Sequence, residues 1–136
     1  MMECIKVPAK IESLDAVNDL VERQLEPRNC AGKTMFQLRL AIEEIFVNIA
    51  SYAYDQGEGE AEVCCEVLED PERVMIRFLD SGTPFDPLAR EDADTSEEAL
   101  MSREGGLGIL LVKNTMDDVQ YAYENGKNIL TILKQL

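Results

Sequence analysis

The chain has 136 residues, of which 46% are hydrophobic and 29% are charged, a composition that supports one packed core and excludes a disordered protein. Its formal net charge is −14, from 13 Lys and Arg against 27 Asp and Glu, so its general field repels nucleic acid and anionic membranes. No apolar run approaches the ~20 residues of a membrane span, and no secretory signal is visible. We therefore expect a single cytoplasmic domain, residues 1–136, that binds neither nucleic acid nor membrane.

The sequence contains no histidine, which excludes histidine general bases, Ser-His and Cys-His nucleophile pairs, and the usual zinc sites. Catalysis in this chain must depend on carboxylates, a lysine, or a metal with its ligands. The four cysteines form no CxxC pair, and the adjacent Cys64 and Cys65 point to opposite faces if they lie on a strand. We expect all four thiols to be reduced and partly buried.

The first predicted elements are a strand and two helices. Residues 2–8 form a short strand, and a helix over residues 13–25 places its apolar side chains on one face. Thr34 and Gln37 stand in a capping-box pattern that predicts the start of a second helix. That helix, over about residues 35–54, is the most apolar of the chain and should lie at the centre of the domain.

Two hairpins and one more helix follow. The order β-α-α-β-β-loop-α-β-β favours an α+β fold, a two-layer sandwich in which helices cover one face of a mixed, largely antiparallel sheet. A doubly wound parallel sheet would need strands that alternate with helices, which this chain lacks. Asn125-Gly126 fits a type I′ turn between the last two strands. The remaining predicted elements are strands over residues 61–68 and 73–80, an acidic segment over 86–103, a helix over about 107–116, and strands over 119–123 and 128–136.

The first candidate site is EEIFVN within the central helix. Glu44 and Asn48 are four residues apart and therefore lie on one face of the helix, beside its apolar stripe. A solvated polar edge would account for them without any function. As a functional pair, Asn48 would offer its amide oxygen to a divalent cation, and Glu44 would accept a proton.

The second candidate site is FLDSGTPFDP, which follows a predicted strand. Its Asp, Ser, Gly and Pro residues are all turn formers, so an ordinary turn is the simpler explanation. As a binding site, Asp80 would accept a hydrogen bond from a donor such as an exocyclic amine. Gly82 would let a flat ring lie against the backbone.

The third candidate site is EGGLGILLV, residues 104–112. A mobile loop that ends at a helix would explain its glycines. As a binding site, it would be a lid whose end brings backbone N–H groups and a helix N-terminus to phosphates. The Rossmann sequence GxGxxG and the P-loop sequence are both absent.

In this order, the three segments resemble the motifs of the GHKL ATPase superfamily, whose nucleotide site is the Bergerat fold. EEIFVNIASYAY resembles its N box, DSGTPFDP its first glycine box, and GGLGILLV its second. Within the superfamily, the short chain, the D-x-G-x-P-F-D-P pattern and the ending GLGILLVKNTMDDVQY are similar to bacterial anti-sigma factor serine/threonine kinases. The resemblance covers the chain from about residue 5 to its end.

The resemblance implies ATP and Mg²⁺ as cofactors. Asn48 would coordinate the metal, and Glu44 would be the general base that deprotonates a serine or threonine of a partner protein. Asp80 would recognise the adenine amine, with Gly82 beside the base. The other nucleotide-binding residues implied by the resemblance are Phe85, Gly105, Gly106, Leu107 and Gly108.

The resemblance also implies a lid and partners. The acidic segment over residues 89–104 corresponds to the ATP lid, and we expect it to be poorly ordered without nucleotide. Either Arg103 or Lys113 could supply the positive charge near the γ-phosphate. The expected partners are a sigma factor, a STAS-domain anti-sigma factor antagonist and a second copy of the chain. The alternative is an ATP-binding interaction module of a partner-switching pathway with little or no kinase activity.

Overall fold

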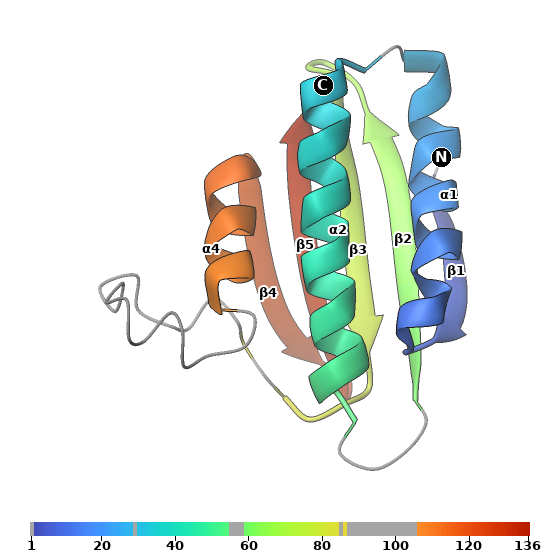
Figure 1. Cartoon of the computed structure of the whole chain (residues 1–136), viewed down its shortest axis with the longest axis vertical. Coiled ribbons are helices and arrows are strands. Elements are labelled where there is room, and N and C mark those ends of the chain that lie inside the picture. Colours follow the sequence, from blue (N-terminus) through green and yellow to red (C-terminus); the bar gives the residue numbers. More distant parts are fainter. Residues whose placement is uncertain (1, 29, 55–58, 85, 87–105) are drawn as a thin grey trace.

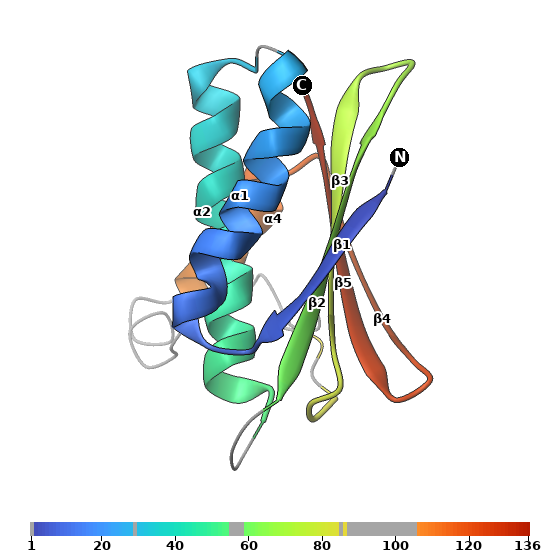
Figure 2. The ribbon, with the colours of Figure 1, turned by 90° about the vertical axis from the view of Figure 1, so that its right-hand side faces the viewer.

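A computed structural model of the chain describes residues 2–28, 30–54, 59–84, 86 and 106–136. Within these residues, a five-stranded sheet forms one layer and three α-helices form the other (Figures 1 and 2). The predicted α+β two-layer fold is confirmed. The described strands pair antiparallel throughout, so the sheet is simpler than the mixed arrangement expected.

The order of the elements along the chain is also as predicted, and the sheet order is β1-β2-β3-β5-β4. Two short 3-10 turns, Ile11–Ser13 and Glu26–Arg28, flank the first helix. The main elements are β1 (Glu3–Pro8), α1 (Leu14–Leu25), α2 (Gly32–Tyr52), β2 (Glu60–Leu68), β3 (Arg73–Asp80), α4 (Gly106–Thr115), β4 (Asp118–Glu124) and β5 (Lys127–Gln135).

The helices bury the apolar stripes that their sequences predicted. On α1, Val17, Leu20 and Leu25 are buried against the sheet, as expected from their 3.6-residue period. The predicted capping box is wrong, because α2 begins at Gly32 and no side chain caps it, which leaves Thr34 inside the first turn. None of the described helices has both the length and the apolarity needed to cross a membrane.

The strands direct alternate side chains into the core. Val74, Ile76 and Phe78 of β3 are buried under the helices, and burying each such side chain stabilises the fold by roughly 1.5–3 kcal/mol. The last hairpin has the predicted type I′ turn, since Asn125 and Gly126 have φ values of 54° and 77°. The hydrophobic pattern therefore fixes which face of each strand meets the helices.

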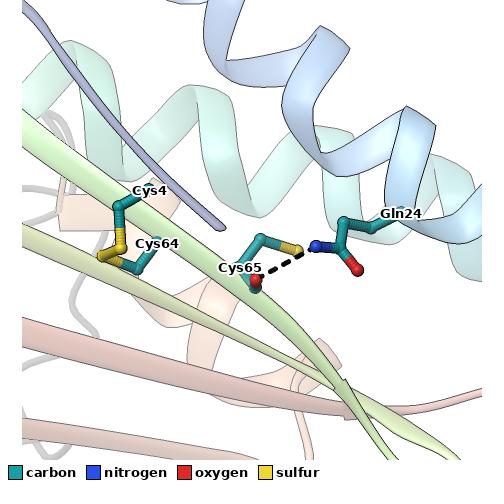
Figure 3. Close-up of a disulfide and its surroundings, with 4 residues drawn as sticks. All are labelled: Cys4, Gln24, Cys64 and Cys65. Atoms are coloured by element: carbon teal, nitrogen blue, oxygen red, sulfur yellow. Dashed lines mark hydrogen bonds between the residues drawn. A yellow bond between two sulfur atoms is a disulfide. The ribbon is translucent and has the colours of Figure 1, made fainter. Parts of the chain in front are cut away.

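The cysteines differ in part from the prediction. Cys4 and Cys64 form a disulfide, so the expectation that all four thiols are reduced is wrong for this pair. Strand pairing is the cause, because β1 places Cys4 directly opposite Cys64 of β2. Cys65 points to the other face of β2, toward α1, as the alternation predicted (Figure 3). Burial, followed by the nearby Glu3 and Glu66, raises the pKa of the Cys65 thiol to about 12, so this group stays neutral.

Candidate functional site

Several elements begin or end at one end of the sheet, the lower end in Figure 1. β3 ends there at Asp80, α2 ends at Tyr52, and α4 begins at Gly106. β5 also begins at this end, and its Asn128 lies opposite Asp80 in the antiparallel register. The three predicted site segments, which are distant in the sequence, therefore contribute described residues to one end of the domain.

Asp80 is a buried carboxylate with an ordered environment. Its side chain is 7% exposed, and its Oδ1 accepts hydrogen bonds of 2.9 Å from the Gly82 backbone N–H and from Asn128 Nδ2. Such bonds are required, because a buried carboxylate without donors is strongly destabilising. Every recorded bond from the described residues goes to Oδ1, which leaves Oδ2 as an acceptor for a ligand.

Asn128 orients this carboxylate and was missed by the sequence reasoning. Its Nδ2 donates to Asp80 and also to the backbone oxygen of Thr83 at 3.0 Å. The hydroxyl of Tyr121 donates to Asn128 Oδ1, so the amide nitrogen is the atom turned toward Asp80. The signal was present in the sequence, because Asn128 shares the inward phase of β5 with the buried Leu130.

Gly82 is required by a close approach between two backbone segments. A Cβ at this position would lie 2.0 Å from the backbone oxygen of Ala53, just after α2. The same oxygen accepts a 2.9 Å hydrogen bond from the Thr83 N–H. This packing explains the glycine of the second candidate segment without a ligand. Its predicted contact with a flat ring stays a prediction.

Tyr54 makes a further link that the sequence reasoning did not identify. Its hydroxyl donates to the backbone oxygen of Glu60 at 2.6 Å and accepts from the Ser81 N–H at 3.0 Å. The end of α2 and the turn after β3 are thereby joined through one phenol group. No periodicity in the sequence singles out this tyrosine. We call Asp80, Ser81, Gly82 and Thr83, with Tyr54 and Asn128, the Asp80 platform.

Glu44 and Asn48 lie on the same face of α2, as predicted from their spacing, and we call this pair the polar edge of α2. Both side chains are half-buried, while the neighbouring Ile45 and Phe46 are buried in the core. Within the described part of the chain, neither polar side chain has a hydrogen-bond or ion-pair partner. Their oxygens are therefore available to a cation, a nucleotide or an incoming hydroxyl group.

The third candidate segment forms the start of α4. Gly106, Leu107 and Gly108 make up its first turn, where backbone N–H groups have no partner within the helix. Val112, one turn further, is buried and fixes α4, which packs against α2. A helix N-terminus at this end of the sheet is suited to bind an anion.

Other predicted site residues lie outside the described residues. They are Phe85, Gly105 and the expected lid over residues 89–104, which includes Arg103. Lys113, the alternative cation, is half-buried on α4. The choice between Arg103 and Lys113 stays open.

The chemistry of the described groups fits a magnesium nucleotide. The polar edge of α2 offers oxygen atoms, which Mg²⁺ prefers over nitrogen and sulfur ligands. Asp80 offers an ordered acceptor suited to an exocyclic amine. The start of α4 offers backbone donors suited to phosphates. The three groups of atoms lie on different elements of the fold, and their contacts with a base, a metal and phosphates stay predictions.

Comparison with known sequences identifies related proteins. The family described as histidine kinase-like ATPase domain matches residues 7–134. The chain is 34% identical over 97 residues to the serine-protein kinase RsbW of Listeria monocytogenes, a match that covers 68% of this chain and 61% of that protein. It is 29% identical over 130 residues to the serine-protein kinase RsbW of Bacillus cereus, which covers 93% of this chain and 80% of that protein.

Solved structures share the fold. The RsbU and RsbW domains of Rv1364c from Mycobacterium tuberculosis match with a TM-score of 0.70 and 14% identity, over 100% of this chain and 32% of that chain. The histidine kinase AdeS of Acinetobacter baumannii matches with a TM-score of 0.52 and 14% identity, over 96% of this chain and 67% of that chain. At this identity, both comparisons concern the fold alone.

Proposed function

This chain belongs to the family of histidine kinase-like ATPase domains, and from that premise we propose that it is an ATP-dependent serine/threonine protein kinase. Its substrate is a STAS-domain anti-sigma factor antagonist, and it also binds and sequesters a sigma factor. The proposal draws on the similarity to two proteins named serine-protein kinase RsbW. It also draws on the three motifs, which resemble those of anti-sigma factor kinases.

The ordered Asp80 carboxylate is the observation that carries the proposal. Two donors fix its Oδ1, so Oδ2 is held in place before any ligand binds. A carboxylate accepts a hydrogen bond from the exocyclic amine of adenine, whereas it repels the carbonyl oxygen that guanine carries at the same ring position. This site therefore favours ATP over GTP.

The transfer step requires few protein groups. Phosphoryl transfer depends mainly on positioning and on neutralising the charge of the phosphates. Asn48 would hold Mg²⁺, which when bound neutralises phosphate charge, and the first backbone N–H groups of α4 would hold phosphate oxygens. Glu44 would take the proton of the attacking serine or threonine hydroxyl. A carboxylate can do this without histidine, which the chain lacks.

The charge of the chain bears on its partners. With a net charge of −14, it attracts proteins that present basic surfaces and repels nucleic acid. A sigma factor or an antagonist would therefore bind through a basic patch. We also propose that the chain acts as a homodimer, as the resemblance implies.

Transfer of labelled γ-phosphate from ATP to a purified STAS-domain antagonist tests the proposal. Glu44→Ala should lower the transfer rate by about 10²–10⁴-fold while ATP affinity is retained. Glu43→Ala is the matched control, because the adjacent Glu43 is exposed and should leave transfer unchanged. If the wild-type chain binds ATP and the antagonist but never transfers phosphate, the kinase proposal is rejected. The alternative, an ATP-binding interaction module, then remains.

A further inference from the structure

Three side chains whose atoms can bind a metal ion lie together on the sheet face that the helices do not cover. Cys4 of β1 lies directly opposite Cys64 of β2, and Glu62 precedes Cys64 by two residues, so it shares the same face of β2. One ligand atom from each side chain lies within 4.8 Å of the other two. Cys64 is buried, Glu62 is half-buried and Cys4 is exposed, so an ion could reach the cluster from solvent.

The cluster is separate from the Asp80 platform. Cys64 points away from the helices, whereas Cys65 points toward α1, where its backbone oxygen accepts a bond from Gln24 (Figure 3). Asp80 shares the helix-facing phase of β3 with the buried Phe78. The cysteine pair and the nucleotide site therefore lie on opposite faces of the sheet.

We propose that the reduced form of this cluster binds one Zn²⁺ ion through Cys4 Sγ, Cys64 Sγ and a carboxylate oxygen of Glu62. Zn²⁺ accepts thiolate and carboxylate ligands at about 2.3 Å and 2.0–2.2 Å, and three protein ligands with one water complete a tetrahedron. Two soft sulfur ligands select Zn²⁺ over Mg²⁺, which prefers oxygen. The cluster and the proposed Mg²⁺ site therefore do not compete for the same ion.

The neighbouring strand supplies a balancing charge. Two thiolates and one carboxylate around Zn²⁺ carry a net charge of −1, and Arg77 of β3 lies directly opposite Cys64. Among the described residues, Arg77 Nε is buried without a hydrogen-bond partner. Arg77 therefore offers a positive charge on the strand next to the cysteine pair.

The disulfide and the zinc site are alternative states of the same two sulfurs. A phosphine reductant gives two electrons to the disulfide and takes an oxygen atom from water. The S–S bond breaks, and each sulfur receives one proton. Zn²⁺ then displaces both thiol protons as it binds. In either state, the edge strand β1 is tied to β2.

Zinc titration of the reduced full chain, without a histidine tag, tests the proposal. A chromophoric chelator that competes for Zn²⁺ should report one tight site per chain, and no histidine is present to bind the ion elsewhere. Cys4→Ser and Cys64→Ser should each lower the affinity by about 100-fold, and Glu62→Gln by about 10-fold. Cys30→Ser and Glu66→Gln are matched controls that should leave the affinity unchanged.

Cobalt provides a second measurement that separates loss of the site from loss of folding. Co²⁺ bound to the reduced chain should show charge-transfer absorption from its two thiolate ligands. Glu62→Gln keeps both thiolates and should retain part of this absorption, whereas Cys64→Ser removes one thiolate and should reduce it further. Circular dichroism of each variant checks that the fold is intact. The proposal is rejected if reduced wild type binds Zn²⁺ no more tightly than the cysteine variants, or if the oxidised chain binds it equally well.

Discussion

The Asp80 platform and the polar edge of α2 are built in opposite ways. In the platform, the Asp80 carboxylate, the Asn128 amide and the Tyr54 hydroxyl are all engaged by other described groups. On the polar edge, the side chains of Glu44 and Asn48 make no hydrogen bond within the described part of the chain. The folded chain itself completes the part of the site suited to a nucleobase, whereas the part suited to a metal and to proton transfer has no partner within the described residues.

This difference separates stability from function. Groups that satisfy one another in the folded chain contribute to its stability, and their loss leaves buried polar atoms unpaired. Groups held ready for a ligand contribute little until the ligand arrives. Substitutions in the platform should therefore change the free energy of unfolding, whereas substitutions on the polar edge should change only binding or transfer.

Gly82→Ala should have the largest effect on stability. The added Cβ would lie 2.0 Å from the backbone oxygen of Ala53, and the hydrogen bond from the Thr83 N–H to that oxygen holds the two backbone segments together. We expect the free energy of unfolding to fall by at least about 3 kcal/mol. Urea denaturation followed by circular dichroism measures the change.

Gly32→Ala is the matched control for this prediction. Gly32 is the first residue of α2, and a Cβ there would have no atom within 4 Å. The free energy of unfolding should stay within about 1 kcal/mol of wild type, in the stabilising direction. If Gly82→Ala were equally harmless, the close approach of Gly82 to Ala53 would not constrain the fold, and the prediction for the platform would be wrong.

Asn128→Ala should have an intermediate effect on the free energy of unfolding and should also lower the affinity for ATP. It removes one of the two donors to Asp80 and the link to Thr83, and a hydrogen bond to a buried charge contributes about 1.5–3 kcal/mol. ATP affinity should fall about 10-fold, because the carboxylate loses its fixed orientation. Calorimetric ATP titration and urea denaturation measure the two effects.

Asn114→Ala, at an exposed position of α4, is the matched control. It should change neither the free energy of unfolding nor the affinity for ATP. Unchanged ATP affinity in a folded Asn128→Ala variant would show that Asp80 needs no support from β5. The bond from Asn128 to Asp80 would then be a structural feature without a role in binding.

The local patterns of the sequence predicted most of the fold. Alternation along β3 predicted its bounds of Arg73–Asp80, and the Asn125-Gly126 turn followed from its two residues alone. The capping-box prediction failed because α2 already starts at Gly32, which places Thr34 inside the first turn of the helix and not before it. Local signals identify elements reliably and their ends less well.

The site was predictable only where it depends on local spacing. The shared face of Glu44 and Asn48 follows from one helical turn. The bond between Asn128 and Asp80 joins residues 48 positions apart, and it exists only because β3 and β5 pair in one register. The same holds for Cys4 and Cys64, at a separation of 60. Contacts of this kind require the sheet order, which the sequence pattern does not give.

Asn48→Ala should have the smallest effect on stability, and it tests the prediction that the polar edge of α2 serves binding and not the fold. Its half-buried side chain has no partner among the described residues, so the free energy of unfolding should change by less than about 0.5 kcal/mol. ATP affinity in the presence of Mg²⁺ should fall about 10-fold, because the proposed metal loses its protein ligand. With the metal chelated, wild type and variant should bind ATP equally. A loss of affinity that persists without Mg²⁺ would mean that Asn48 contacts the nucleotide directly, and a loss of stability would mean that the polar edge supports the fold as the platform does.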